Sequence, residues 1–284
     1  MSNNRLEAHR LSDKEFRFIC DLVYQATGIV LDERKREMVY RRLMRRTRSL
    51  KIASFSDYCE LLASGCDNEL PEFINSITTN LTSFFRENHH FDYLKNSFLP
   101  EHLAKHGHSK RLRIWSAACS TGEEPYSLAV TLHEAMGSLL NSWDAKILAT
   151  DLDTNVLATA IDGIYKDERI KDIPENYKKK WFKRGSGENS SQVKVAPKLQ
   201  ALITFKQLNL LHQWPIKGPF DIIMCRNVLI YFDKPTQQQL IARYYELIRP
   251  GGLLILGHSE SLAKDDKHFD IVGRTIFKKP ESRG

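Results

Sequence analysis

Two adjacent glutamates, Glu123 and Glu124, end a loop of small residues that follows the apolar run 112–115. A strand that turns through small residues into a helix is how α/β folds hold a nucleoside cofactor. A diphosphate cofactor requires bare backbone N–H groups and the positive end of a helix. Glutamates would repel phosphate, whereas they suit sugar hydroxyls, an ammonium or a sulfonium. The segment WSAACSTGEEPYS (residues 115–127) therefore predicts a site for S-adenosylmethionine rather than for NAD or ATP.

Asp151 follows the next apolar run, residues 146–150, where such a domain places an acidic residue on ribose hydroxyls. A carboxylate accepts two hydrogen bonds there, each stronger than a neutral pair. The alternative for an aspartate here is to cap the next helix, and Asp153 fits that role better because the helix begins at Thr154. Glu123 likewise either binds the cofactor or stabilises the start of its helix, and the two roles are compatible.

Two polar turns follow later apolar runs. Asn209 and Leu210 lie where an adenine ring is usually bracketed, or they form a simple turn. Arg226, Asn227 and Tyr231 follow a buried strand whose end faces the cleft in this architecture, so they are expected to face the ligand. The alternative is an Asn-capped turn with Tyr231 in the core.

The elements that must position these residues alternate along the second half of the chain. Apolar, β-branched runs are separated by helical patterns, which is typical of a buried parallel sheet in an α/β fold. The predicted strands are residues 112–117, 146–150, 203–207, 220–225 and 253–257. Residues 249–252 (RPGG) are expected to form a turn before the last of them, and residues 269–278 to give two edge strands.

Residues 163–202 are too many for a connection between two of these strands. They contain a lysine-rich helical pattern at 175–182, the loop RGSG at 184–187 and an alternating stretch at 193–195. Glycine and serine between short β-patterned runs predict a small inserted antiparallel sheet.

The N-terminal part, residues 12–80, has helical periodicity and no strand pattern. Ser12 and Glu15 form a capping-box pattern, and Gly28 suits the end of the first helix. A further helix at about 89–106 leads into the sheet. The chain has a net charge of +7, and residues 33–51 alone contain nine positive and two negative side chains, which is also +7. This basic helix predicts one acidic partner surface.

The composition excludes several classes of protein. No run approaches the roughly 18–20 apolar residues that span a bilayer, and the polar start MSNNRLEAHR predicts no signal peptide. No HExxH or CxxC pattern predicts a metal site. The scattered, odd set of cysteines predicts reduced thiols in a cytoplasmic protein. These are Cys20, Cys59, Cys66, Cys119 and Cys225.

Six motifs together resemble the chemotaxis receptor methyltransferases of the CheR family. They are TTNLTSFFRE (78–87), WSAACSTGEEPYS (115–127), ATDLD (149–153), CRNVLIYF (225–232), RPGG (249–252) and GHSES (257–261). The resemblance extends over about residues 11–277. It implies a Rossmann-like methyltransferase sheet with an N-terminal all-helical domain and a small inserted antiparallel β-subdomain. The expected domains are residues 1–80, a linker and leading helix at 81–111, and a catalytic domain at 112–284.

The resemblance also implies an activity. Members transfer a methyl group from S-adenosylmethionine to glutamate side chains of bacterial chemoreceptors, which gives methyl esters and S-adenosylhomocysteine. The implied cofactor contacts are Asn80, Thr82, Arg86, Glu123, Asp151, Asn209, Leu210, Arg226 and Asn227. Arg86 would face the methionine carboxylate, and Tyr231 would lie nearest the methyl group. A glutamate carboxylate is ionised at neutral pH and needs no general base.

The partners follow from the same resemblance. The basic helix, with Arg41, Arg42, Arg45 and Arg46, is expected to face the acidic methylation helices of the receptor. The inserted β-subdomain holds a C-terminal receptor peptide by strand addition in some members, and the RGSG loop resembles that subgroup. We expect a monomer that binds no nucleic acid and no metal and does not enter the membrane. The rival hypotheses are a nucleic-acid methyltransferase and a non-catalytic scaffold.

Overall fold

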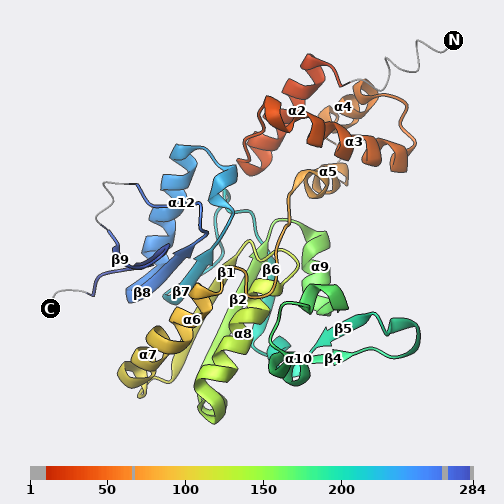
Figure 1. Cartoon of the computed structure of the whole chain (residues 1–284). Coiled ribbons are helices and arrows are strands. Elements are labelled where there is room, and N and C mark those ends of the chain that lie inside the picture. The colour runs from red at the N-terminus through yellow and green to blue at the C-terminus, as the bar shows by residue number, and fades with distance from the viewer. Residues whose placement is uncertain (1–10, 66–67, 264–267, 282–284) are drawn as a thin grey trace. The chain divides into compact units, whose positions relative to one another are not determined.

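The computed structural model describes residues 11–65, 68–263 and 268–281. Cys66 and the first ten residues, on which the prediction of no signal peptide rests, lie outside these ranges. The chain divides into two compact units (Figure 1). The first comprises Met1–Thr79 with Tyr231–Thr236, and the second comprises Asn80–Ile230 with Gln237–Gly284.

All the regular elements among the described residues of the first unit are helices. Its elements are α2 (Asp13–Thr27), a 3-10 turn (Glu33–Lys35), α3 (Arg36–Leu50), α4 (Phe55–Ala63) and α5 (Glu69–Ile77). The predicted capping box is confirmed, because the Ser12 hydroxyl accepts from the Glu15 backbone while the Glu15 carboxylate accepts from the Ser12 backbone. Gly28 ends α2 in the left-handed region, with φ of 71°. The predicted helical domain is therefore present.

The second unit is built on a seven-stranded sheet in the order β6-β2-β1-β7-β8-β10-β9. The first five strands in this order are parallel, and β10 runs antiparallel to β8 and β9. The strands are β1 (Arg111–Ala117), β2 (Asp144–Asp151), β6 (Ile203–Gln207), β7 (Phe220–Cys225), β8 (Ile248–Leu256), β9 (Asp270–Gly273) and β10 (Ile276–Lys278). The predicted parallel sheet and its two additional C-terminal strands are confirmed.

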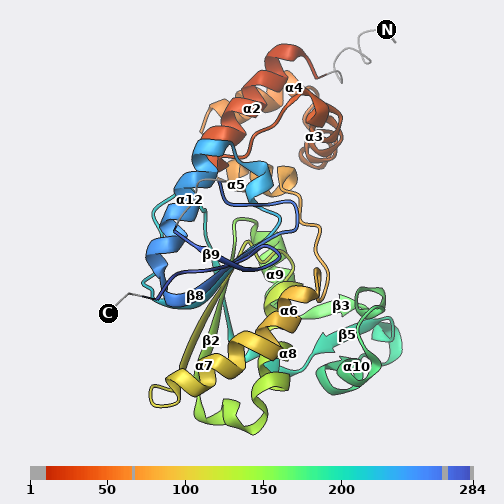
Figure 2. The same cartoon turned by 60° about the vertical axis from the view of Figure 1, so that its left-hand side comes forward.

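Helices cover both faces of this sheet, which is why its central strands β1, β7 and β8 are buried along most of their length. On one face lie α6 (His89–Tyr93), α7 (Leu99–His106) and α8 (Glu123–Met136) (Figure 2). A π-helical turn, Leu94–Phe98, joins α6 to α7, so the predicted helix at 89–106 is continuous. On the other face the Trp115 ring packs against Tyr244 of α12 (Lys234–Leu247), with ring centroids 5.4 Å apart. The helix α9 (Thr154–Asp162) follows β2.

The predicted insertion is a separate three-stranded antiparallel sheet in the order β3-β5-β4. Its strands are β3 (Ile164–Lys166), β4 (Phe182–Arg184) and β5 (Gln192–Val195), and its helices are α10 (Glu175–Trp181) and α11 (Pro197–Gln200). The helix α10 ends one residue earlier than predicted because Phe182 already belongs to β4.

The prediction of a turn at 249–252 is wrong. These residues lie inside β8, which begins at Ile248. Gly251 has φ of 76°, and its N–H donates to the Lys279 carbonyl at 2.8 Å. The register between β7 and β8 shifts between Phe220 and Ile222. The Pro-Gly-Gly segment is therefore an irregularity within the strand, where glycine permits a conformation that other residues avoid.

Candidate active site at the carboxyl edge of the sheet

The loop between β1 and α8 is tightly wound. Ala118, Ser120 and Gly122 all have positive φ, of 61°, 51° and 95°. A side chain at Gly122 would place its Cβ 2.8 Å from the Cβ of Ala160 in α9. Glycine is therefore required both by the backbone conformation and by the close approach of α9. This geometry presents the loop directly beside the end of β2.

Asp151 ends β2 and holds that loop. Its carboxylate accepts from the Ser120 N–H at 2.7 Å and from the Asp153 N–H at 3.0 Å. Burial raises the pKa of Asp151 to about 6, and the backbone hydrogen bonds only partly offset this effect. Each carboxylate oxygen has two lone pairs, so the Asp151 carboxylate can still accept hydrogen bonds from hydroxyl groups. The assignment of Asp151 to ribose hydroxyls stays a prediction that this geometry permits.

Asp153 is the helix cap that the sequence indicates. Its carboxylate accepts from the backbone of Asn155 at 2.9 Å and of Val156 at 3.3 Å. It also accepts from the Asn80 amide at 2.7 Å, and the Asn80 carbonyl accepts from the Ser120 hydroxyl at 3.0 Å. The structure therefore brings Asn80 to the same strand ends as Asp151.

Glu123 begins α8 and is fully buried. The Thr121 hydroxyl donates to its Oε2 at 2.6 Å, and Arg169 donates from Nε to its Oε1 at 3.0 Å. The same guanidinium donates to the Thr82 carbonyl at 2.9 Å. Glu123 and Thr82, both predicted cofactor contacts, are thus joined by Arg169. Sequence reasoning missed Arg169, which lies far along the chain in the insertion and in none of the six motifs.

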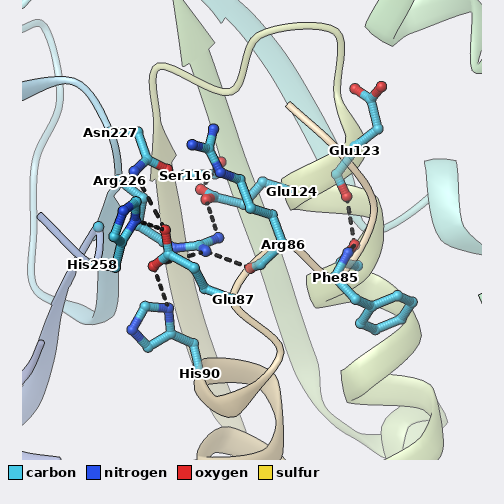
Figure 3. A network of polar contacts seen from close by, with 12 residues as sticks. Phe85, Arg86, Glu87, His90, Ser116, Glu123, Glu124, Arg226, Asn227 and His258 are labelled. Atoms are coloured by element: carbon cyan, nitrogen blue, oxygen red, sulfur yellow. Dashed lines mark hydrogen bonds and ion pairs between the residues drawn. The ribbon is translucent and has the colours of Figure 1, made fainter. Parts of the chain in front are cut away.

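Arg226 follows β7 and lies between two carboxylates (Figure 3). Its guanidinium is 3.0 Å from Glu124 and 3.3 Å from Glu87, and its side chain is 2% exposed. It also donates to the Arg86 carbonyl. The two carboxylates neutralise the Arg226 charge within the protein. The expectation that Arg226 faces the ligand stays a prediction.

Glu87 is the centre of this network. Burial alone would raise its pKa, but His258 at 2.9 Å, Arg226 and the Asn227 amide at 3.3 Å together lower it to about 2. Glu87 is therefore ionised at neutral pH. In the sequence, Glu87 is part of the motif at 78–87, but no role is predicted for it because nothing along the chain indicates its contact with Arg226.

Glu260 fixes the loop that carries Asn227. Its carboxylate accepts from the N–H groups of Asn227 at 2.9 Å, Val228 at 2.8 Å and Gly257 at 2.6 Å. Asn227 has φ of 60°, and a Cβ on Gly257 would lie 2.5 Å from the Asn227 amide nitrogen. The motif GHSES was the signal for this role, because its Gly257 and Glu260 together hold the loop.

Three other residues predicted to contact the cofactor, Arg86, Asn209 and Leu210, lie in two different segments of the chain. Arg86 is partly exposed and donates to the Leu81 carbonyl at 2.8 Å. The Asn209 side chain accepts from the Leu211 N–H at 3.0 Å, and the Leu210 carbonyl accepts from Trp214 at 3.0 Å. The loop after β6 is thus a hydrogen-bonded turn.

Tyr231 belongs to the first unit. Its carbonyl accepts from the Val30 N–H at 2.8 Å, and the Lys35 ammonium lies 5.0 Å from the centre of its ring. Its expected place beside the methyl group stays a prediction.

The arrangement suits a cofactor with hydroxyl and cationic groups. Its buried acceptors are the carboxylates of Asp151 and Glu123, whereas a phosphate site would require donors. Among residues 11–65, 68–263 and 268–281, no group of three or more His, Cys, Asp or Glu side chains could hold a metal ion. In the same ranges, no helix is both long and apolar enough to cross a membrane.

The four arginines predicted to bind the receptor divide into two pairs. Arg41 and Arg45 are exposed on α3, and Arg41 pairs with Glu37 at 2.7 Å. Arg42 donates to the carbonyls of Ile77 and Thr78, at 2.7 Å for Thr78, and burial lowers its pKa.

Arg46 forms a two-pronged pair with Glu69, at 2.9 and 2.6 Å. Arg42 and Arg46 therefore hold the helical unit together, and Arg41 and Arg45 are the members of this set that remain at the surface.

Comparison with known proteins identifies both units. Residues 14–78 match the family described as CheR methyltransferase, all-alpha domain, and residues 80–278 match CheR methyltransferase, SAM binding domain. The chain is 46% identical over 269 residues to the chemotaxis protein methyltransferase of Escherichia coli, which covers 94% of this chain and 91% of that protein. It is also 46% identical to chemotaxis protein methyltransferase 2 of Pseudomonas aeruginosa, over 93% and 92% of the two chains. The chain therefore belongs to the CheR methyltransferase family and is an S-adenosylmethionine-dependent methyltransferase of chemotaxis.

Proposed function

We propose that this enzyme methylates glutamate side chains of chemoreceptors to give glutamate methyl esters. The observation that carries the proposal is the pair of buried carboxylates, Asp151 and Glu123, beside neighbouring strand ends in a chain of this family. When bound, S-adenosylmethionine supplies an electrophilic methyl group on a sulfonium. The task left to the protein is to hold that group in line with an acceptor.

We propose that different loops bind different parts of the cofactor. Asp151 accepts the ribose hydroxyls and Glu123 accepts the ammonium group, while Arg86 donates to the methionine carboxylate. Asn209 and Leu210 bracket the adenine. The cofactor site is completed by Asn80, Thr82 and the Arg226–Asn227 turn. Arg226 contributes by holding the carboxylates of Glu124 and Glu87 in place. Tyr231 is proposed to lie nearest the methyl group.

A carboxylate acceptor fits this set of residues. It is already nucleophilic at neutral pH, so its methylation needs no proton acceptor. The exposed Arg41 and Arg45 on α3 suit an acidic helical surface such as a receptor methylation region.

The inserted β-subdomain supports the proposal of a receptor-tail tether. Its strand β4 is at the edge of the sheet and can pair with an added strand. A cavity of about 490 Å³ lies beside it, with Ile170, Phe182 and Val193 among its apolar lining residues and Lys178 and Lys179 among its cations. An extended peptide with apolar side chains and a terminal carboxylate fits this lining. Such a tether raises the local concentration of substrate without changing the active site.

The test uses S-adenosylmethionine labelled on the methyl group and chemoreceptor cytoplasmic fragments, with and without their last residues. Label on the receptor should be released as methanol in mild alkali, because carboxyl esters hydrolyse under those conditions. Label that survives alkali would contradict the glutamate assignment and favour methylation of nitrogen. Equal rates for complete and truncated fragments would contradict the tether alone.

A further inference from the structure

Arg169 connects the inserted β-subdomain electrostatically to the cofactor loop. It lies in the 3-10 turn Asp167–Ile170, and its side chain is 38% exposed, whereas that of Glu123 is 0% exposed. We propose that Arg169 is an internal cation that holds Glu123 in the free enzyme and competes with the ammonium group of the cofactor for this carboxylate. The inference rests on the proposed assignment of Glu123 to that ammonium group.

The competition follows from the contacts of the Glu123 carboxylate. Oε2 accepts from Thr121, and Oε1 accepts from two nitrogens of Arg169. Three of its roughly four acceptor positions are therefore in use. A second cation at the same buried carboxylate would be repelled by the first, and the repulsion is strong where water is excluded. Arg169 can yield, because its partly exposed side chain has access to water.

Release of Arg169 would not detach the β-subdomain from the loop. The Tyr165 hydroxyl of β3 donates to the Thr121 carbonyl at 2.6 Å. The Tyr165 ring also packs on Phe84, with centroids 5.1 Å apart. These contacts involve no charge and remain when the ion pair opens. The change is thus confined to the turn 167–170.

That turn also contributes to the cavity beside β4. Asp167, Glu168 and Ile170 line the cavity, and Arg169 lies between them in the chain. Coupling free energies are reciprocal, so an event in this turn that loosens Arg169 from Glu123 also tightens cofactor binding. The cofactor site and the β-subdomain are therefore linked through one side chain.

The test compares two ligands by calorimetry in the full-length protein. S-adenosylhomocysteine carries the ammonium group, whereas 5′-methylthioadenosine lacks the whole amino-acid part and does not reach Glu123. In Arg169→Met, S-adenosylhomocysteine should bind about three- to tenfold more tightly, because the ammonium no longer displaces a competing cation. Binding of 5′-methylthioadenosine should be unchanged, which also shows that the variant is folded.

Lys166→Met is the matched control. It removes an exposed positive charge three residues away in the same subdomain, and both ligands should bind it as they bind the wild type. Titrations in two buffers of different ionisation enthalpy count the protons that the protein takes up or releases when the ligand binds. Affinities are compared at a pH where that count is zero.

Unchanged or weaker binding of S-adenosylhomocysteine by Arg169→Met would overturn the competition. Equal changes for both ligands would also overturn it, since they would reveal a purely structural role. Glu123→Gln separates this inference from the proposed function. If that variant binds S-adenosylhomocysteine as tightly as the wild type, the assignment of Glu123 is itself wrong.

Discussion

The end of α5 in the helical unit and the loop after β7 at the carboxyl edge of the sheet are held by charges of opposite sign. In the helical unit, arginine is the donor, and Arg42 contacts the Ile77 and Thr78 carbonyls at the end of α5. At the sheet edge, carboxylates are the acceptors, and Glu260 contacts the N–H groups of Asn227 and Val228.

The difference follows from which backbone groups lack partners. A helix ends with carbonyls that have no partner within the helix, so a cation near that end is stabilising. A loop wound through left-handed residues, such as Asn227, turns its N–H groups inward, so a carboxylate satisfies them. The sign of a buried charge therefore reflects the local backbone as much as any ligand. Asp151 holds its loop in the same way, and we propose that it also accepts the ribose hydroxyls.

Arg46→Ala gives the largest expected effect on this comparison. It leaves Glu69, whose side chain is 6% exposed, without its cation, and we expect the free energy of unfolding of the helical unit to fall by about 3 kcal/mol. Far-ultraviolet circular dichroism in urea measures this loss. Tryptophan fluorescence should hardly change, because all four tryptophans lie in the second unit.

The control is Arg45→Ala, one position earlier and exposed. It should unfold as the wild type does. Equal losses in the two variants would mean that position on the helix, rather than the buried pair, determines stability.

Glu260→Gln tests the opposite arrangement. The glutamine amide has one acceptor oxygen in place of two. Backbone N–H groups that donate to the second oxygen in the wild type would face an NH₂ group in the variant. Since an unsatisfied buried donor costs about 1–3 kcal/mol, S-adenosylhomocysteine should bind about tenfold or more weakly as the loop rearranges. Glu246→Gln, on the exposed face of α12, is the control and should bind normally. Normal binding of S-adenosylhomocysteine by Glu260→Gln would mean that Glu260 does not support the cofactor site.

The fold was more predictable than the site because its signals are local. The alternation of apolar runs with helical patterns predicted the sheet, and capping residues predicted the helix α2. The long distance between two predicted strands indicated the insertion. None of these predictions needs knowledge of contacts. The contacts that the sequence did not predict join residues that are distant along the chain. Nothing near Arg226 indicates that Glu87 and Glu124 enclose it, and nothing near Arg46 indicates Glu69. The π-helical turn and the bulge at Gly251 likewise depend on packing between elements.

The proposed dual role of Asp151, in holding the loop and in binding ribose, predicts a pH dependence. Its pKa in the folded protein is about 6, above the ordinary 3.8, so protonation of Asp151 favours the fold as the pH falls from about 6 to 3.8. Ribose hydroxyls donate to the ionised form, so cofactor affinity should change in the other direction and weaken as the pH falls through about 6. Asp151→Asn should bind about tenfold more weakly at neutral pH, since it loses a charge-assisted pair.

Calorimetry at a series of pH values measures both effects. The variant should lose the component of the pH dependence that is centred near pH 6. If it retains that component, another group is responsible and the ribose assignment is wrong.

The smallest expected effect concerns the surface members of the basic helix. Arg41→Glu with Arg45→Glu should lower the rate of receptor methylation about threefold at low salt, and less at high salt, because exposed charges act mainly on encounter. Lys198→Glu with Lys217→Glu makes the same change in net charge on exposed residues of the second unit and should have little effect. Both variants should bind S-adenosylhomocysteine normally. Since Arg42 and Arg46 are kept, a loss that persists at high salt would indicate direct contact with the receptor rather than electrostatic attraction. Equal losses in the two variants would show that net charge, not the basic helix, attracts the substrate.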